Sequence, residues 1–203
     1  MEQKKWKKFI PALLARAKSE GLTIIDEKSQ NPEETALQIA FKNYPFDEDV
    51  IKTLLEQGAS IYDENGTTIE HESVTIKDSG IILSKKTHLS FLVVAIHKKN
   101  ANVIKAILEL AEEDGRFNEI LEYKSEIPQN AQKHEDWLNG VDFVGYKNKE
   151  PLKQTALEQA LLLNEKEHSD KTAEIVKALS KSGATVSEEF LKNIDRKLYD
   201  SFR

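Results

Sequence analysis

The sequence predicts an all-α protein: a helical repeat solenoid with a cap helix at each end and two inserts containing short β-hairpins. Three observations lead to this class. Two stretches of the chain can be aligned as copies of one unit. Within each copy the apolar residues recur at the three- and four-residue spacing of a helix. The connections between copies are longer than a plain array needs, so they are expected to hold structure of their own.

The repeated unit consists of a short inner helix, a turn and an outer helix. The first copy begins with Thr-Ala-Leu-Gln-Ile-Ala at 35–40, and the last begins with Thr-Ala-Leu-Glu-Gln-Ala at 155–160. Thr35 stands where an N-cap side chain is expected. Gly58 follows the outer helix of the first copy, where glycine can end a helix in the left-handed conformation. Neither helix covers the apolar stripe of the other alone, so neighbouring copies are expected to stack.

A middle copy is found by alignment on the aliphatic pair Val103-Ile104. Its front is Ser90-Phe91-Leu92-Val93-Val94-Ala95, with Ser in place of Thr. This copy lacks the closing Gly-Ala, because Leu110 and Ala111 occupy that region, and we expect it to end at residue 111.

These units resemble ankyrin repeats, whose pattern runs Thr-Pro-Leu-His-x-Ala, then Val-Val-x-Leu-Leu, then Gly-Ala-Asp over about 33 residues. The chain departs from that pattern at the Pro and His positions and lacks the Gly-His between the helices. The replacing residues are Ala36, Phe91 and Ala156 for Pro, and Gln38, Val93 and Glu158 for His. The resemblance covers about half of the chain. It implies a non-catalytic module that binds a partner protein through its concave face and hairpin tips, without cofactor or metal.

The remaining segments complete the predicted organisation of one domain, 1–203. The apolar stripe from Phe9 to Ala17, ended by Gly21, predicts an N-terminal cap helix, and Ser187 begins a C-terminal one. β-rich residues on both sides of Asp78-Ser79-Gly80 predict a hairpin. The divisions are cap 1–30, repeat 31–61, insert 62–86, repeat 87–111, insert 112–150, repeat 151–185 and cap helix 186–203.

Two groups of residues are candidates for partner binding. The first follows the small alanine of the inner helix and is expected on the concave face: Lys42, Asn43, His97 and Lys98. The second consists of aromatic residues in the second insert, which can anchor an interface: Trp137, Phe143 and Tyr146. The alternative for the aromatic residues is burial in a small core of the insert itself.

Composition excludes several other classes of function. The chain has no Cys, which removes disulfides and thiolate metal sites, and its net charge of −6 opposes a nucleic-acid partner. No apolar run is long enough to span a membrane, and the basic start does not read as a signal peptide. The five His residues show no close-pair metal spacing, and no phosphate-binding or nucleophile motif is present.

The sequence therefore predicts a cytoplasmic monomer that binds another protein. Its size and its Lys- and Glu-rich composition also resemble ankyrin-type effectors that intracellular bacteria deliver into host cells. The alternative from a different class is an enzyme with a His and carboxylate site formed between an insert and the repeats.

Overall fold

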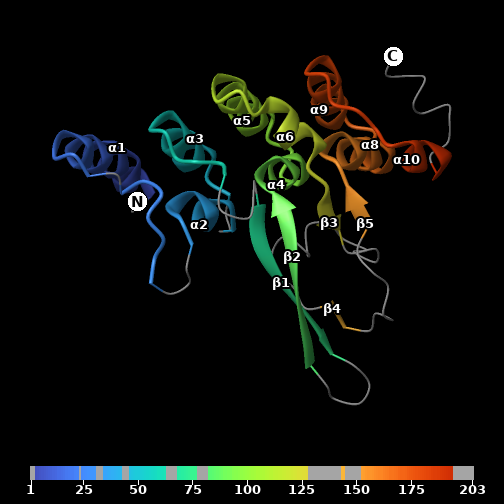
Figure 1. The fold of residues 1–203 in the computed structure, drawn as a ribbon, viewed down its shortest axis with the longest axis horizontal. Coiled ribbons are helices and arrows are strands. Elements are labelled where there is room, and N and C mark those ends of the chain that lie inside the picture. Colours follow the sequence, from blue (N-terminus) through green and yellow to red (C-terminus); the bar gives the residue numbers. More distant parts are fainter. Residues whose placement is uncertain are drawn as a thin grey trace. The chain divides into compact units, whose positions relative to one another are not determined.

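The computed structural model describes residues 3–22, 24–30, 34–42, 46–62, 68–76, 82–127, 143–144 and 152–193. Most of these residues are helical, as the sequence predicts (Figure 1). The chain divides into two compact units, 1–66 and 67–203, where the sequence predicts one domain. Each unit is described by itself.

In the residues described, the first unit contains three helices. They are α1 (Gln3–Ser19), α2 (Ala36–Lys42) and α3 (Glu48–Glu56). Helix α3 packs against both α1 and α2. The core of the unit is aliphatic and aromatic, and its buried residues are Ala17, Leu37, Phe41, Ile51, Leu54, Leu55, Ala59 and Ile61.

The start of α2 and the end of α3 are formed by the capping residues that the sequence predicts. Thr35 caps α2, since its Oγ1 accepts a hydrogen bond from the Gln38 amide at 3.2 Å while the Gln38 side chain accepts one from the Thr35 amide at 2.9 Å. Gly58 has a φ of +88° and directly follows the last turn of α3. The Ala59 amide then donates to the Leu54 carbonyl at 2.9 Å, which closes the helix. Both predicted ends are confirmed.

The second unit contains helices and strands. Its described helices are α4 (Phe91–His97), α5 (Ala101–Glu113), α6 (Phe117–Glu122), α8 (Ala156–Glu167), α9 (Asp170–Lys181) and α10 (Glu188–Asn193). Its strands are β1 (Thr68–Ile76), β2 (Ile82–Ser90), β3 (Ser125–Ile127), β4 (Phe143–Val144) and β5 (Leu152–Gln154).

Strands β1 and β2 form the antiparallel hairpin predicted for the first insert. They pair in register from Thr68 opposite Ser90 to Ile76 opposite Ile82, so each strand is nine residues long. Strand β4 of the second insert pairs with β1 in parallel, through Thr75 and Phe143. A separate antiparallel pair is formed by β3 and β5. The hairpin extends away from the start of α4 (Figure 1).

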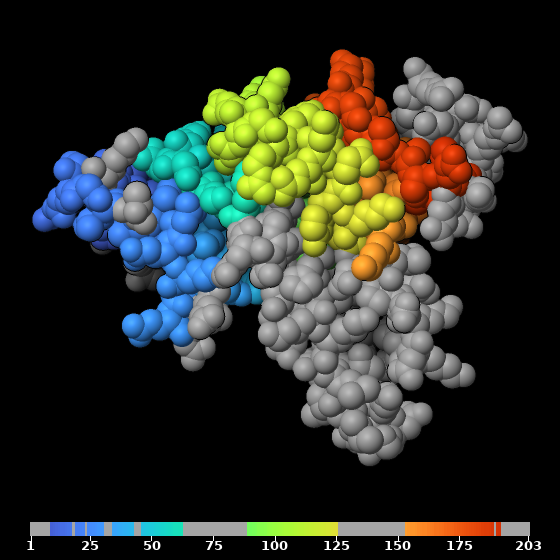
Figure 2. All heavy atoms as spheres, viewed as in Figure 1, coloured from blue at the N-terminus to red at the C-terminus, as the bar shows by residue number. Residues whose placement is uncertain are grey.

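The helices of the second unit form a stack of two pairs. Helix α4 packs against α5 and against α8, and α8 packs against α9. Helix α5 also contacts α9 and α6. Strand β2 runs directly into α4, and β5 is followed by α8 after one residue, so both inner helices begin at the end of a strand (Figure 1). Helices α5, α6 and α9 form much of the surface of this unit that Figure 2 shows.

Both inner helices of this stack start at a hydroxyl cap. Ser90 Oγ accepts from the Val93 amide at 3.1 Å, and Thr155 forms a capping box with Glu158. The outer helices α5 and α9 are capped by Asn100 and Ser169. Each outer helix therefore starts from its own cap residue. That cap directly follows a residue with a left-handed backbone conformation, Lys99 before α5 and His168 before α9.

One predicted boundary is wrong: the middle copy does not end at residue 111. Helix α5 continues to Glu113 and is followed by Gly115, whose φ is +69°. The Arg116 amide then donates to the Ala111 carbonyl at 3.0 Å. Leu110 and Ala111 lie inside the last turns of α5, so the glycine that ends this copy stands further along the chain.

Candidate binding groove

The first unit contains a groove lined by residues of α1, α2 and α3 and by Ile24 and Ile25. Its volume is ≈ 580 Å³. Of the eleven described residues that line it, ten are apolar: Ile10, Leu13, Leu14, Ile24, Ile25, Ala36, Ile39, Ala40, Val50 and Leu54, with Asp47 as the polar exception. Of these residues only Leu54 is fully buried. The walls of the groove are thus aliphatic and remain in contact with solvent.

Helix α1 leaves part of its apolar surface uncovered. Ala17 is buried, but Leu13 is 45% exposed and Phe9, one turn earlier, is 54% exposed. The sequence predicts that this stripe packs as a cap on the repeats. An uncovered apolar surface of this kind is typical of a site that another molecule covers.

Small residues on α2 help to leave the groove open. Ala36 and Ala40 line it on one side, and Ile39 lies between them. An alanine side chain projects one carbon atom from the helix, so this wall leaves space that a larger residue would fill.

Acidic residues lie at the start of α3, where the groove reaches Asp47. The Asp47 carboxylate caps α3 by accepting hydrogen bonds from the Asp49 and Val50 amides at 3.2 and 3.3 Å. Glu48 and Asp49 follow in the first turn, where carboxylates are favoured by the helix dipole. Of these three carboxylates, Asp47 is the one that lines the groove.

Two nearby cations are held by carboxylates. Arg16 Nε on α1 lies 2.9 Å from Glu20, and Lys42 on α2 forms an ion pair with Glu34. Lys42 is a predicted binding residue, and its side chain lies on the surface of the first unit. Asn43, which follows it, lies outside the described residues.

The prediction that His97 projects on a concave face is wrong. Its side chain is 5% exposed, and all seven residues of α4 are buried. The sequence of this helix, Phe-Leu-Val-Val-Ala-Ile-His, is apolar on every side except at its last residue, which is typical of a helix enclosed by neighbours. His97 Nε2 meets Gln159 Oε1 of α8 at 3.1 Å.

Lys98 caps the C-terminus of α4 and is half-buried, directly beside His97 in the second unit. Phe143 belongs to β4, and the structure describes its backbone only. Trp137 and Tyr146 lie outside the described residues. The structure therefore brings together only His97 and Lys98 among the predicted residues of this unit.

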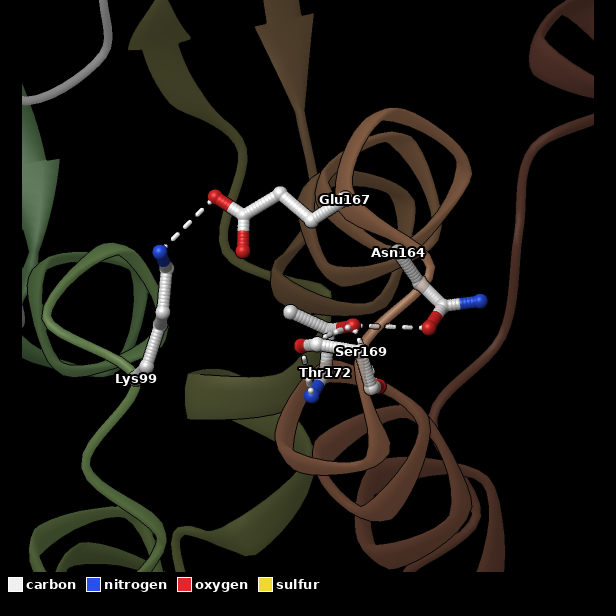
Figure 3. Close-up of polar contacts among 5 residues, drawn as sticks. All are labelled: Lys99, Asn164, Glu167, Ser169 and Thr172. Carbon is white, nitrogen blue, oxygen red and sulfur yellow. Dashed lines mark hydrogen bonds and ion pairs between the residues drawn. The ribbon is translucent and has the colours of Figure 1, made fainter.

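Several buried polar groups of the second unit have partners that explain them structurally. Gln159 links His97 to Gln154, because its amide nitrogen donates to the Gln154 side-chain oxygen. At the turn between α8 and α9, Thr172 Oγ1 donates to Asn164 Oδ1 at 2.8 Å, and Lys99 forms an ion pair with Glu167 at 2.8 Å (Figure 3). These contacts fix helices relative to one another.

The residues that the structure describes show little sign of a metal site or of a buried reactive group. Among them, no group of three His, Cys, Asp or Glu side chains could hold a metal ion. A hydrogen bond from Arg116 lowers the pKa of Glu119, but both groups lie on the surface. In the same residues no helix is long and apolar enough to cross a membrane.

Comparison with known proteins gives no match to a family model, to a curated protein or to a solved structure. The groove is the site that sequence reasoning missed. The signal for it was the width of the α1 stripe, in which Phe9 and Ile10 are followed by Leu13 and Leu14.

Proposed function

We propose that this chain is a non-catalytic protein-binding module and that the groove of its first unit holds a segment of the partner protein. The observation that carries the proposal is the groove itself, with its aliphatic and partly exposed walls. Burial of apolar surface is the main source of affinity between proteins, and such surface is rarely left open without a use.

A small-molecule site is a weaker explanation of the same groove. Pockets of this volume that bind metabolites usually hold several convergent polar groups, which fix the orientation of the ligand. Among the described residues that line this groove, Asp47 is the polar one, and its carboxylate already caps α3. An apolar groove of this kind suits a partner that is recognised mainly through apolar side chains.

The ankyrin-like architecture is part of the same proposal. It is supported by the stack of α4 and α5 on α8 and α9, and by the strands that lead into both inner helices. The hydroxyl caps of α2, α4 and α8 stand at corresponding positions of the three copies. Partner binding by the insert aromatics Trp137, Phe143 and Tyr146, and delivery into a host cell, stay predictions from the sequence.

The proposal is tested by partner capture from cell lysates with the full chain and with two matched variants. Leu13→Asn makes one wall of the groove polar without changing charge. Leu22→Asn makes the same change at a leucine that is 52% exposed but does not line the groove. We expect a partner that is captured by the wild type and by Leu22→Asn but lost by Leu13→Asn, with both variants folded by circular dichroism. Equal capture by all three proteins would contradict the groove as the site.

A further inference from the structure

We propose that helix α1 also binds the surface of an anionic lipid membrane. The helix lies along the interface, with its exposed apolar edge among the lipids and its lysines beside the headgroups. This function goes beyond the groove, because it uses the outward side of α1 and Phe9, which does not line the groove. Two features of α1 lead to it: its charge, and the exposure of apolar residues next to that charge.

Helix α1 is strongly basic in a chain that is otherwise acidic. It contains six cations and no carboxylate between Gln3 and Ser19: Lys4, Lys5, Lys7, Lys8, Arg16 and Lys18. The carboxylates that flank it in the sequence are Glu2 and Glu20, and Glu20 is paired with Arg16. When that pair is counted as neutral, the helix still carries five lysines, although the whole chain has a net charge of −6.

Apolar residues on the outward side of α1 lie next to these cations. At about 100° per residue, Lys5, Phe9, Ala12 and Arg16 form one row along the helix, and Leu13 follows Phe9 by one turn. Phe9 is 54% and Leu13 45% exposed, and Ala12 and Arg16 are exposed as well. This row therefore faces solvent, and it combines an apolar edge with positive charge.

An anionic membrane surface suits this combination better than another polyanion does. Helices that lie at a membrane interface carry Lys and Arg on their polar face and Trp, Phe or Leu on the other, and they need not span the bilayer. Clusters of about four to eight such cations on an amphipathic helix are typical of binding to anionic lipids. A nucleic acid would attract the lysines through its phosphates but would give the exposed Phe9 and Leu13 no role.

The negative charge of the rest of the chain limits how the protein approaches such a surface. Helix α3, which packs against α1, carries three carboxylates and one lysine, and its cap Asp47 adds a fourth carboxylate. This charge lowers the attraction of the five lysines but does not cancel it. Charges further away are screened over about 8 Å at physiological ionic strength. We therefore expect binding in one orientation, with α1 against the membrane.

The test is co-sedimentation of the full chain with lipid vesicles. Vesicles of phosphatidylcholine alone are compared with vesicles that contain about 30% phosphatidylserine, at low and at high salt. We expect binding to the anionic vesicles and not to the neutral ones, with an affinity that falls as salt increases.

A matched pair of charge variants tests the lysines. The double variant Lys5→Glu, Lys8→Glu reverses two charges on α1. The double variant Lys171→Glu, Lys177→Glu makes the same change in net charge at two exposed positions of α9. We expect the α1 variant to bind anionic vesicles at least about tenfold more weakly, and the α9 variant to stay within about threefold of the wild type.

A second pair of variants tests the apolar edge. Phe9→Ser removes the exposed ring without changing charge, and Leu191→Ser makes a similar change at a leucine of α10 that is 37% exposed. We expect Phe9→Ser to weaken binding about fivefold and Leu191→Ser to leave it within about twofold. Circular dichroism verifies that all four variants are folded.

The outcomes decide the proposal independently of the groove. Preference for anionic vesicles that is weakened by both α1 variants, and by neither control, supports it. Absence of binding, equal binding to both kinds of vesicle, or equal loss in the controls overturns it. Loss in the Lys5→Glu, Lys8→Glu variant without loss in Phe9→Ser also overturns it, because the lysines then adsorb to the surface without an inserted helix. Binding of a labelled DNA duplex in place of vesicles would assign the basic helix to nucleic acid. The proposed function is tested separately, by capture with Leu13→Asn.

Discussion

His97 Nε2 lies 3.1 Å from Gln159 Oε1, and this contact joins the inner helices α4 and α8 inside the second unit. Both residues are buried, and Gln159 also donates to Gln154 at the end of β5. A buried polar contact of this kind fixes the register of two packed helices, because any other register leaves polar atoms unsatisfied.

The first prediction concerns this contact. Gln159→Leu should destabilise the second unit by about 1–3 kcal/mol, because it leaves His97 and Gln154 buried without their shared partner. Urea denaturation followed by circular dichroism measures the loss. Glu165→Leu, an exposed change on the same helix, should stay within about 0.5 kcal/mol of the wild type. Equal stability of the two variants would show that the contact does not stabilise the unit.

The second prediction concerns Glu158, which is 1% exposed and connects α8 to the start of α10. Its Oε2 accepts from the Thr155 amide at 2.9 Å, and its Oε1 accepts from the Ser187 amide and hydroxyl at 2.8 and 2.6 Å. Glu158→Ala should lower the free energy of unfolding by about 2–4 kcal/mol, since three donors lose the carboxylate that accepts their hydrogen bonds. Hydrogen exchange should also show faster exchange in α10. Unchanged exchange there would mean that other contacts hold this helix.

The third prediction concerns strain at His168, an exposed residue with a φ of +49°. Glycine adopts this left-handed conformation readily, whereas other residues do so at a cost. His168→Gly should therefore stabilise the unit by about 0.5–1 kcal/mol, while His168→Ala, which removes the same ring and keeps a Cβ, should not. Thermal unfolding of the two variants compares them directly. A gain in both would assign the effect to loss of the imidazole.

The fourth prediction concerns Glu119, whose pKa is lowered by a hydrogen bond from Arg116 and by the charge of that guanidinium. Arg116→Ala should raise this pKa toward the ordinary value of glutamate, which a carboxyl chemical-shift titration measures by NMR. Because the folded-state pKa is depressed, the stabilisation is present above the ordinary pKa and is lost as pH falls through the folded-state pKa. The effect on stability is small, since both groups are exposed. An unchanged midpoint would contradict the assignment to Arg116.

Local chemistry explains which features of the fold could be predicted. The N-cap at Thr35 and the glycine end at Gly58 depend on residues within one turn, and both are present. The end of the middle copy lies later than predicted, because Leu110 and Ala111 occupy the region where the pattern places Gly-Ala, while Gly115 follows only after a further turn. Because the repeat is degenerate, its pattern does not fix how far along the chain the closing glycine stands.

Exposure could not be predicted in the same way, because it depends on neighbours distant in the sequence. His97 is covered by α8, and its partner Gln159 stands 62 positions later. The sequence did not predict the groove for the opposite reason, because residues expected to be buried are exposed. The apolar stripe of α1 predicts a helix that packs, but the spacing alone does not show that Leu13 and Phe9 remain uncovered.

The central claim is that the groove between α1, α2 and α3 holds the partner. Hydrogen exchange of the full chain, with and without a captured partner, tests it most directly. The account predicts slower exchange in α1, α2 and α3 when the partner is bound, and no such change in the Leu13→Asn variant. Protection confined to residues 67–203, with none in the first unit, would contradict the account and move the site to the second unit.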